Sequence, residues 1–329
     1  MKILVTGAAG FIGYHTTNYL LEEGHQVIGV DNFNNYYEPS LKHFRNNLLN
    51  GFPDYEINTV DISNKNGVDS IFREFEFDAV IHLAAQAGVR LPVENYNQYT
   101  QSNLVGFENI ASNVKKFNVP IFFYASSSSV YGDYAASPLS ESELVLKPNS
   151  YYGATKYSNE IVANALFDGT KQKVLGLRFF SVYGPLGRPD MAYFRLIRAA
   201  ILNDNFNLFG DGSIKRDFTY IDDVTRSLSS LLRRTREANK GFSEVINIGG
   251  GQPMSMIQLI ETITLLTGNK ININYLEGNK DDSKSTCAST SKIVEWIGIK
   301  PEIKLNEGIT RTYEWMRSNK VFPMLKDWV

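Results

Sequence analysis

A glycine-rich turn directly after the first predicted strand constrains the fold of this chain most strongly. The apolar run Ile3–Val5 is followed at once by TGAAGFIG at residues 6–13, and a helical pattern continues through Tyr14–Glu23. Glycines in a strand-to-helix turn let the backbone approach a pyrophosphate, and the free N–H groups at the helix N-terminus attract an anion. The turn, with its spacing GxxGxxG, therefore predicts a dinucleotide site formed by Gly7, Gly10, Phe11, Ile12 and Gly13.

The alternation of strand and helix continues through the first half of the chain. The predicted buried strands are Ile3–Val5, Val27–Val30, Ala79–Leu83, Ile121–Ala125 and Val174–Leu177. The predicted helices between them are Tyr14–Glu23, Val68–Phe75, Tyr99–Lys116 and Tyr151–Leu166. Continuous apolar strands that alternate with helices are typical of βαβ units in a parallel sheet, with ligands at the carboxyl ends of its strands. The predicted fold class is α/β, with a doubly wound parallel sheet.

The pattern changes after Arg178, where glycines and prolines mark a long loop. Further helices are predicted at Tyr193–Leu202 and Asp222–Arg234, and strands at Asn207–Phe209, Val245–Ile248 and Ile271–Tyr275. No low-complexity linker separates these elements from the first half. We therefore expect a nucleotide-binding domain of residues 1–180 plus about 220–248. A smaller, interleaved lobe of residues 181–219 and 249–329 is expected to bind the substrate.

The composition argues against several classes of function. Lys and Arg number 33 against 35 Asp and Glu, so the net charge of -2 predicts no nucleic-acid partner. Cys287 is the only cysteine, which precludes an intramolecular disulfide and fits a reducing compartment. No segment approaches the ~20 apolar residues that span a bilayer, and no signal peptide is recognisable at the N-terminus. We expect a cytoplasmic protein with no membrane partner and no metal site.

Asp31 stands at the end of the second predicted strand, 18 residues after Gly13. A carboxylate at this position can accept hydrogen bonds from both hydroxyls of an adenosine ribose. It would repel a 2′-phosphate, and the neighbouring Asn32 and Phe33 offer no compensating cation. The expected cofactor is therefore NAD rather than NADP.

Tyr152 and Lys156 are four residues apart, so they share one face of the predicted helix. The helix follows the strand Ile121–Ala125, which places the pair beside the nicotinamide end of a bound dinucleotide. A tyrosine of ordinary pKa, about 10, is a poor base at neutral pH. A nearby ammonium and an oxidised nicotinamide would both lower that pKa. The pair is predicted to move a proton to and from a hydroxyl while the cofactor exchanges a hydride.

Four consecutive serines, Ser126 to Ser129, follow the same strand. Serine runs often form plain polar loops. Here they leave the carboxyl end of a buried strand, where a hydroxyl could polarise a reacting oxygen.

Seven segments carry a resemblance to a known family. They are TGAAGFIG (6–13), DNFNNYYEPSLK (31–42), HLAAQAGVR (82–90), YASSSSVYG (124–132), YYGATK (151–156), LRFFSVYGPLGRPDMA (177–192) and GDGSIKRDFTYIDDV (210–224). Through them the chain resembles the extended short-chain dehydrogenase/reductase superfamily, whose cofactor domain has the Rossmann-type fold. Within the branch that acts on nucleotide sugars, it looks most like the UDP-glucuronate 4-epimerases.

The resemblance implies further contacts with NAD. Asp61 and Ile62 resemble the pair that contacts adenine in the family. The expected cofactor set also contains Asn32, Leu83, Ala84, Ala85, Gln86, Asn103 and Phe180, besides the glycine turn, Asp31, Tyr152 and Lys156. The resemblance also implies a homodimer that pairs the helices Tyr99–Lys116 and Tyr151–Leu166.

The serine run distinguishes this chain from related enzymes with other activities. Ser127 takes the place of the hydroxyl that supports the catalytic tyrosine in the family. Related sugar dehydratases carry Asp-Glu at the positions of Ser128 and Ser129, and related decarboxylases carry Glu at Ser129. Because neither acid is present, we expect neither elimination nor decarboxylation. The expected catalytic set is Tyr152, Lys156 and Ser127.

The resemblance also implies the reaction cycle. NAD would oxidise C4 of the UDP-sugar while Tyr152 takes the hydroxyl proton, and the 4-keto ring would turn before it is reduced on its other face. A 4-keto uronic acid is a β-keto acid, so the enzyme must hold its carboxylate away from the orientation that releases CO₂. Side chains expected to contact the UDP-sugar are Arg90, Ser127, Ser128, Ser181, Arg188, Arg216 and Asp282.

The chain departs from the family at or beside two of these positions. Ser181 stands where threonine is expected, and NKDDS at residues 279–283 replaces Pro-Gly-Asp-Val-Pro, of which only Asp282 is retained. The substrate therefore stays open between UDP-glucuronate, UDP-glucose and an N-acetylated uronate. A decarboxylating synthase and a non-catalytic NAD-binding regulator also stay open as functions of the chain. A role in surface-polysaccharide precursor synthesis is the expected setting.

Overall fold

A seven-stranded parallel sheet forms the centre of the larger part of the molecule. The computed structural model describes residues 1–89, 91–278, 285–319 and 321–328. The strands are β1 (Lys2–Thr6), β2 (Gln26–Asp31), β3 (Tyr55–Thr59), β4 (Ala79–His82), β5 (Ile121–Ser127), β6 (Lys173–Phe179) and β10 (Phe242–Ile248). Their order is β10-β6-β5-β4-β1-β2-β3, and every neighbouring pair is parallel. The strand order reverses between β1 and β4, so ligands are expected beside the carboxyl ends of these two strands.

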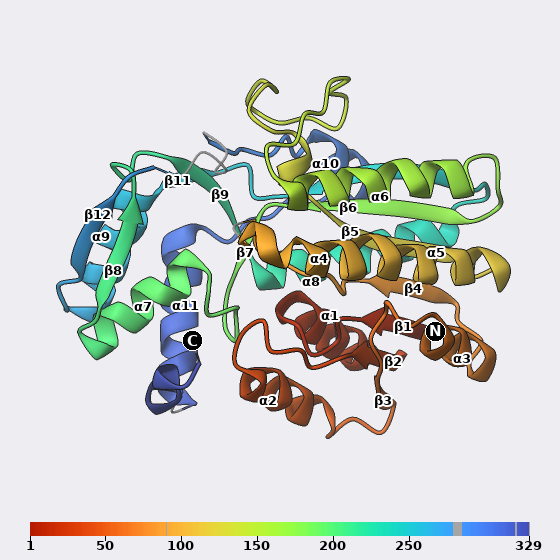
Figure 1. The fold of residues 1–329 in the computed structure, drawn as a ribbon, viewed down its shortest axis with the longest axis horizontal. Coiled ribbons are helices and arrows are strands. Elements are labelled where there is room, and N and C mark those ends of the chain that lie inside the picture. Colours follow the sequence, from red (N-terminus) through yellow and green to blue (C-terminus); the bar gives the residue numbers. More distant parts are fainter. Residues whose placement is uncertain (90, 279–284, 320, 329) are drawn as a thin grey trace.

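Helices cover both faces of this sheet (Figure 1). One face packs against α3 (Lys65–Glu74), α5 (Gly106–Lys116) and α6 (Tyr151–Phe167), around a core that contains Phe107 and Phe122. The other face packs against α1 (Phe11–Glu22), α2 (Pro39–Leu49), α8 (Ile221–Glu237) and α10 (Ser291–Ile297). The second core continues without a break into the smaller lobe, through residues such as Phe194 and Leu228.

The smaller lobe is made of short sheets and three helices. Its elements are β7 (Ser181–Tyr183), α7 (Ala192–Leu202), β8 (Asn205–Phe209), β9 (Lys215–Tyr220), β11 (Pro253–Ser255), α9 (Met256–Thr267), β12 (Asn272–Leu276) and α11 (Leu305–Ser318). They form the sheet β11-β9-β7 and the parallel pair β12-β8. Figure 1 shows this lobe beside the carboxyl ends of the large sheet.

The α/β class and the parallel sheet are confirmed, but three details of the sequence prediction are wrong. The segment between the second and third predicted strands contains α2 and the edge strand β3, neither of which was predicted. Pro39 at the start of α2 and the Glu38 cap, whose carboxylate accepts the Ser40 N–H, were readable signals. The short strands β7, β9 and β11 were also missed.

The third difference concerns the helix predicted over Tyr99–Lys116. The structure has a four-residue α4 (Tyr96–Tyr99), a π-helical turn at Thr100–Val105 and then α5. A π-helical turn shifts the register of the side chains that follow it, and such turns are frequent at functional sites. Here the turn carries Asn103, which is buried toward the site.

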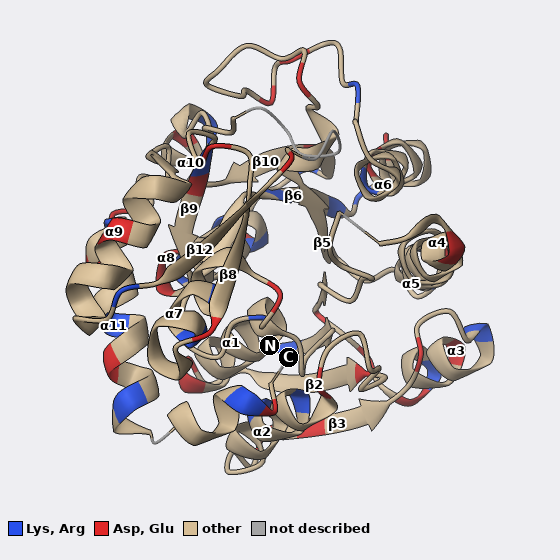
Figure 2. Ribbon diagram, turned by 60° about the vertical axis from the view of Figure 1, so that its left-hand side comes forward, with Lys and Arg blue, Asp and Glu red and all other residues tan. Residues whose placement is uncertain are grey.

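Charges of both signs are distributed over the outer helices (Figure 2). No helix among the described residues has the length and apolarity to cross a membrane. Within the same residues, no group of three or more His, Cys, Asp or Glu side chains could hold a metal ion.

Candidate active site

A cavity of about 690 Å³ lies at the carboxyl ends of the central strands and reaches into the smaller lobe. Its nucleotide side is lined by the glycine turn and Asp31, and its far side by β8, Arg216 and Met256. Tyr152, Lys156 and the serine run lie between these two ends. The cavity therefore has one end suited to a dinucleotide and another that faces the smaller lobe.

The glycine turn forms a close-packed cradle at the start of α1. Gly7 has a φ of +72°, and a Cβ there would lie 2.8 Å from the backbone nitrogen of Ala84. A Cβ on Gly13 would collide with the carbonyl oxygen of Gly7. No side chain caps α1 at Gly10, and its first turn has no acidic residue. The N–H groups of this helix end thus remain available to an anion, which fits the pyrophosphate of NAD.

Asp31 closes β2 beside this cradle. Its carboxylate accepts hydrogen bonds from the N–H groups of Ala9 at 3.1 Å and Phe33 at 2.8 Å. The two residues that follow Asp31 carry no charge, but α2 brings the ammonium of Lys42 to 3.9 Å from the carboxylate. Lys42 also donates to the side chain of Asn34 at 2.8 Å. This cation could not be found from the two residues that follow Asp31, since it belongs to a helix that was not predicted.

Most of the remaining expected cofactor residues line the cavity. They are Phe11, Ile12, Asn32, Ile62, Leu83, Ala84, Ala85, Gln86 and Phe180. Two others, Asp61 and Asn103, are not among the residues that line it. Asp61 accepts a hydrogen bond from the Asn32 side chain at 2.8 Å, and Asn103 binds both backbone groups of Gln86, at 2.8 and 3.2 Å. These two residues therefore hold segments that line the cavity.

Tyr152 and Lys156 lie on the first turns of α6, where Ser150 caps the helix by accepting the Gly153 N–H. Lys156 is only 2% exposed. Its ammonium donates to the carbonyl oxygen of Ala125 at 3.0 Å and lies 5.9 Å from the centre of the Tyr152 ring. Burial lowers the pKa of Lys156 to about 8. The predicted proximity of the pair is present, at the place where β5 delivers the serine run.

The expected fall in the Tyr152 pKa does not follow from the groups of this chain. Burial raises the pKa of the Tyr152 phenol, while the guanidinium of Arg188 and a hydrogen bond with Ser127 act in the opposite direction. The lowering was expected from an ammonium and the nicotinamide. The structure adds Arg188, which faces the same cavity from the loop after β7.

The serines of the run have different positions relative to the cavity. Ser128 and Ser129 line the cavity, whereas the Ser127 hydroxyl bonds Tyr152 and the Ser129 hydroxyl, the latter at 3.2 Å. Ser126 donates to the carboxylate of Glu160 at 2.5 Å. Ser127 therefore connects Tyr152 with Ser129, whereas Ser126 is bound to Glu160.

A buried ion pair behind the serine run was not foreseen. Glu160 on α6 accepts two hydrogen bonds from Arg178 on β6, at 2.9 and 2.8 Å, and Arg178 lies 4.7 Å from the ring centre of Tyr131. Through Ser126, this pair fixes the end of β5 relative to α6, the helix that carries Tyr152. Partners 18 residues apart on a strand and a helix leave no local pattern in the sequence.

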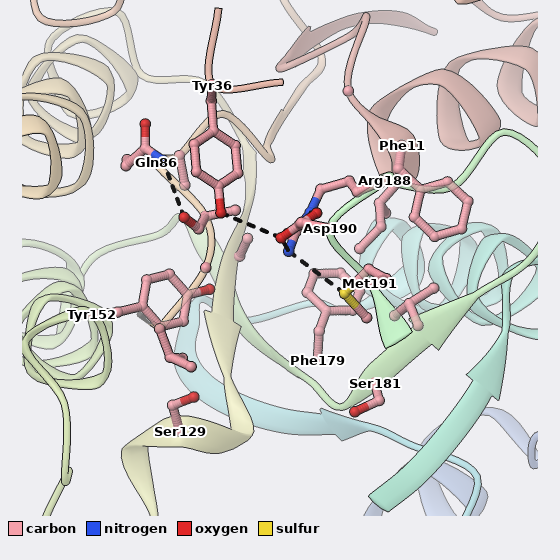
Figure 3. Close-up of a pocket in the computed structure, with 18 of the residues that line it drawn as sticks. Phe11, Tyr36, Gln86, Ser129, Tyr152, Phe179, Ser181, Arg188, Asp190 and Met191 are labelled. Carbon is pink, nitrogen blue, oxygen red and sulfur yellow. Dashed lines mark hydrogen bonds and ion pairs between the residues drawn. The ribbon is translucent and has the colours of Figure 1, made fainter. Parts of the chain in front are cut away.

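The residues expected to bind the sugar are only partly free to do so. The Arg188 guanidinium is engaged by both carboxylate oxygens of Asp190, at 2.9 and 2.8 Å, and Asp190 also accepts from the Tyr36 hydroxyl at 3.3 Å (Figure 3). Asp190 thus binds one edge of the guanidinium, while Arg188 still lines the cavity, and its contact with the substrate stays a prediction. Ser181 lines the cavity beside this group.

Three other expected substrate residues have different outcomes. Arg216 lines the cavity from β9, and one of its guanidinium nitrogens donates to the Lys215 carbonyl at 3.1 Å. Arg90 and Asp282 lie outside the described residues.

A dinucleotide cradle whose sheet also delivers a half-buried tyrosine and a buried lysine to the nicotinamide end is the arrangement of the short-chain dehydrogenase/reductase class. The chain belongs to the NAD dependent epimerase/dehydratase family, whose model matches residues 3–249. NAD is accordingly the cofactor that this cradle serves.

Several relatives resemble the chain along nearly its full length. The UDP-glucuronate 4-epimerase of Thermodesulfobacterium geofontis is 40% identical over 317 residues, which cover 96% of either chain. Protein CapI of Staphylococcus aureus is 38% identical over 328 residues, 96% of this chain and 98% of the relative. The crystal structure of UDP-glucuronic acid 4-epimerase from Bacillus cereus, in complex with UDP-glucuronic acid and NAD, has a TM-score of 0.88 at 33% identity. It covers 97% of this chain and 100% of its own.

Proposed function

We propose that this protein epimerises UDP-glucuronate at C4 to give UDP-galacturonate. The observation that carries the proposal is the group around Tyr152, where serine hydroxyls occupy the positions that hold acids in related dehydratases and decarboxylases. The likeness to epimerases that act on UDP-glucuronate supports the same substrate. NAD, when bound, supplies the oxidation of C4 and the matching reduction, so the reaction has no net redox change.

Tyr152 exchanges the proton of the C4 hydroxyl. As C4 is oxidised, the phenolate accepts this proton, and it returns the same proton when the 4-keto sugar is reduced on its other face. Ser127 hydrogen-bonds the phenol and favours its ionised form, as does the positive charge of Arg188. Lys156 is held by the Ala125 carbonyl at 3.0 Å, with its ammonium 5.9 Å from the centre of the Tyr152 ring.

The hydroxyl groups of the cavity explain how a 4-keto uronate could keep its carboxylate. Ser128, Ser129 and Ser181 line the cavity and can donate directed hydrogen bonds to the carboxylate oxygens. These hydrogen bonds can keep the C–C bond to the carboxylate out of alignment with the π-system of the ketone, which is the orientation in which CO₂ leaves. Asp190 occupies the Nε–Nη2 edge of the Arg188 guanidinium, so hydroxyls that take no part in this ion pair are the more readily available donors.

Product analysis tests this function. The protein with NAD is incubated separately with UDP-glucuronate and UDP-glucose, and the products are separated by chromatography. We expect UDP-galacturonate from the first and little or no product from the second. Turnover of UDP-glucose alone would move the assignment to an epimerase of that sugar, and stoichiometric CO₂ release would make the protein a decarboxylase.

A pair of adjacent tyrosines gives a matched test of the catalytic residue. Tyr152→Phe removes the proton-exchanging hydroxyl, and we expect turnover to fall by about 10²–10⁴-fold while NAD stays bound. Tyr151→Phe removes the neighbouring hydroxyl, which bonds Thr100 at 2.9 Å outside the cavity, and should keep turnover near the wild-type rate. Equal activity of the two variants would favour a non-catalytic NAD-binding protein.

We further propose that the protein is a cytoplasmic homodimer that pairs α5 and α6. The exposed apolar side chains Ile161 and Val162 on α6, and Val105 on the turn that precedes α5, support the proposal, since a second copy would remove them from water. Light scattering of Ile161→Glu against the wild type tests the interface. A wild-type monomer would contradict it.

A further inference from the structure

A buried arginine on α2 connects the cofactor cradle to the loop that carries Arg188. The Arg45 side chain is 0% exposed. One terminal nitrogen donates to the Ala9 carbonyl at 3.1 Å and to the Tyr37 hydroxyl at 2.6 Å. The other nitrogens donate to the Leu186 carbonyl at 3.0 and 2.7 Å and to the Gly187 carbonyl at 3.2 Å. All five N–H donors of the guanidinium are thereby used.

The two preceding carbonyls of the same loop are bound by other helices. The Tyr193 hydroxyl of α7 donates to the Gly184 carbonyl at 2.9 Å, and His15 of α1 bonds the Pro185 carbonyl at 2.8 Å. Because a carbonyl only accepts, His15 must be the donor. Burial lowers the pKa of His15 to about 4, so the ring is neutral at physiological pH. Four consecutive carbonyls, at residues 184–187, are thus fixed by side chains from three helices.

The loop conformation held in this way is not one that its residues favour by themselves. Leu186 has a φ of +54°, in the left-handed region that side chains other than those of Gly, Asn and Asp rarely adopt. Backbone strain of this kind persists only where surrounding contacts fix the chain. The two hydrogen bonds from Arg45 to the Leu186 carbonyl are such contacts, and they end two residues before Arg188.

The partners of Arg45 are also unusual for a buried cation. Among the described residues, all its hydrogen-bond acceptors are neutral oxygens, and no carboxylate forms an ion pair with it. A buried charge is costly unless it is compensated. Its acceptor Ala9 lies between Gly7 and Gly10 of the cradle, so a pyrophosphate bound there would bring negative charge close to the guanidinium.

We propose that Arg45 is a positioning residue that couples occupation of the NAD cradle to the conformation of loop 184–188, and so to the placement of Arg188. This deepens the proposed function, because Arg188 faces the sugar end of the cavity. Arg45 itself does not line the cavity and acts only through Ala9, Leu186 and Gly187. A coupling between two sites is reciprocal, so a UDP-sugar that orders the loop must tighten NAD binding by the same factor.

Hydrogen exchange tests the coupling without any turnover. The exchange of the backbone amides of Leu186, Gly187 and Arg188 is measured by mass spectrometry in NAD-stripped protein before and after NAD is added. We expect NAD alone to slow exchange at these amides in the wild type. In Arg45→Met, NAD should still slow exchange in the cradle at residues 7–13 but no longer in the loop. Exchange in the wild-type loop that does not respond to NAD would overturn the proposal.

Binding titrations provide a second readout. The Kd of NAD is measured with and without saturating UDP-glucuronate, or UDP where the uronate does not bind. Typical couplings are about 5–150-fold, and we expect at least about fivefold in the wild type and a ratio near 1 in Arg45→Met. Arg45→Lys keeps the charge but cannot reach all the acceptors, so it should bind NAD more tightly than Arg45→Met and still lack the coupling. An unchanged ratio in both variants refutes the proposal.

A matched control separates this role from a general loss of stability. Arg73→Met removes an arginine from the exposed face of α3, far along the chain from the cradle, and should leave both readouts unchanged. If Arg45→Met does not fold, the wild-type exchange experiment and Arg45→Lys decide the question. The exchange experiment uses NAD alone, so its result tests the coupling even if UDP-glucuronate is not the substrate.

Discussion

Removal of the buried charge of Lys156 is expected to stabilise the protein while it destroys activity. Burial lowers the pKa of Lys156 from 10.5 to about 8, which at 1.36 kcal/mol per pH unit corresponds to about 3 kcal/mol of destabilisation by the charged form. Lys156→Met removes this charge and keeps most of the side-chain volume. The variant also loses the hydrogen bond to the Ala125 carbonyl, worth about 1 kcal/mol. A net gain of about 2 kcal/mol at neutral pH follows.

The sign of the pH dependence identifies the cause. The folded-state pKa of Lys156 lies below that of a lysine in the unfolded chain, so the unfolded chain binds more protons between pH 8 and 10.5. Wild-type stability therefore rises across this window, as the buried ammonium loses its proton. The advantage of Lys156→Met should be largest below pH 8 and should fall by about 2–3 kcal/mol by pH 10.5, where only the lost hydrogen bond remains.

The assay is thermal unfolding of both proteins without added NAD, at pH 7 and at pH 10. At pH 7 the variant should melt roughly 4 °C above the wild type, at roughly 2 °C per kcal/mol for a chain of this size. The exposed Lys171 serves as control, and Lys171→Met should not change the difference between the two pH values. A Lys156→Met variant that is less stable than wild type by the same amount at both pH values would refute the reasoning.

Three other substitutions test separate parts of the site. Gly13→Ala places a methyl group against the Gly7 carbonyl and should abolish NAD binding in an equilibrium titration, whereas binding of wild-type strength would contradict the cradle. Asp190→Asn removes the negative charge that opposes Arg188, so the pKa of Tyr152 should fall and the acidic limb of kcat/KM should move to lower pH; a shift to higher pH would refute this. Glu160→Gln leaves Arg178 buried without its counter-charge and should cost about 3–5 kcal/mol in chemical denaturation. The exposed pair of Glu244 and Lys292 gives its control, since Glu244→Gln should cost less than about 1 kcal/mol.

The parts of the site that were predictable are those formed by residues close together in the chain. The glycine turn, and the pair Tyr152 and Lys156, each lie within eight residues, so their geometry follows from one turn or one helix. The strand positions of Asp31 and the serine run followed from apolar runs, because parallel strands end at one edge of the sheet. Local pattern and sheet topology together were sufficient for these residues.

The unpredicted parts depend on contacts between distant segments. Arg45 joins Ala9, 36 residues away, to Leu186, 141 residues away, and nothing in its neighbourhood in the sequence indicates either partner. Lys42 was missed as a partner of Asp31 because α2 itself was missed. The resemblance predicted Arg188 as a substrate contact, yet only the folded chain reveals that Asp190 binds one edge of its guanidinium. Motifs indicate which residues gather at a site, whereas the folded chain determines which of them neutralise one another.

The position of β10 has a consequence for how the chain is made. This strand is the outermost member of the large sheet beside β6, yet the chain reaches it only after building β7, α7, β8, β9 and α8. On the ribosome, the sheet therefore cannot be completed until more than sixty further residues after β6 have been synthesised. Until β10 has been synthesised, the edge of β6 that pairs with it has no partner strand. A fragment that ends at residue 180 would leave that edge open to other strands, so the two lobes are expected to be inseparable in folding as well as in function.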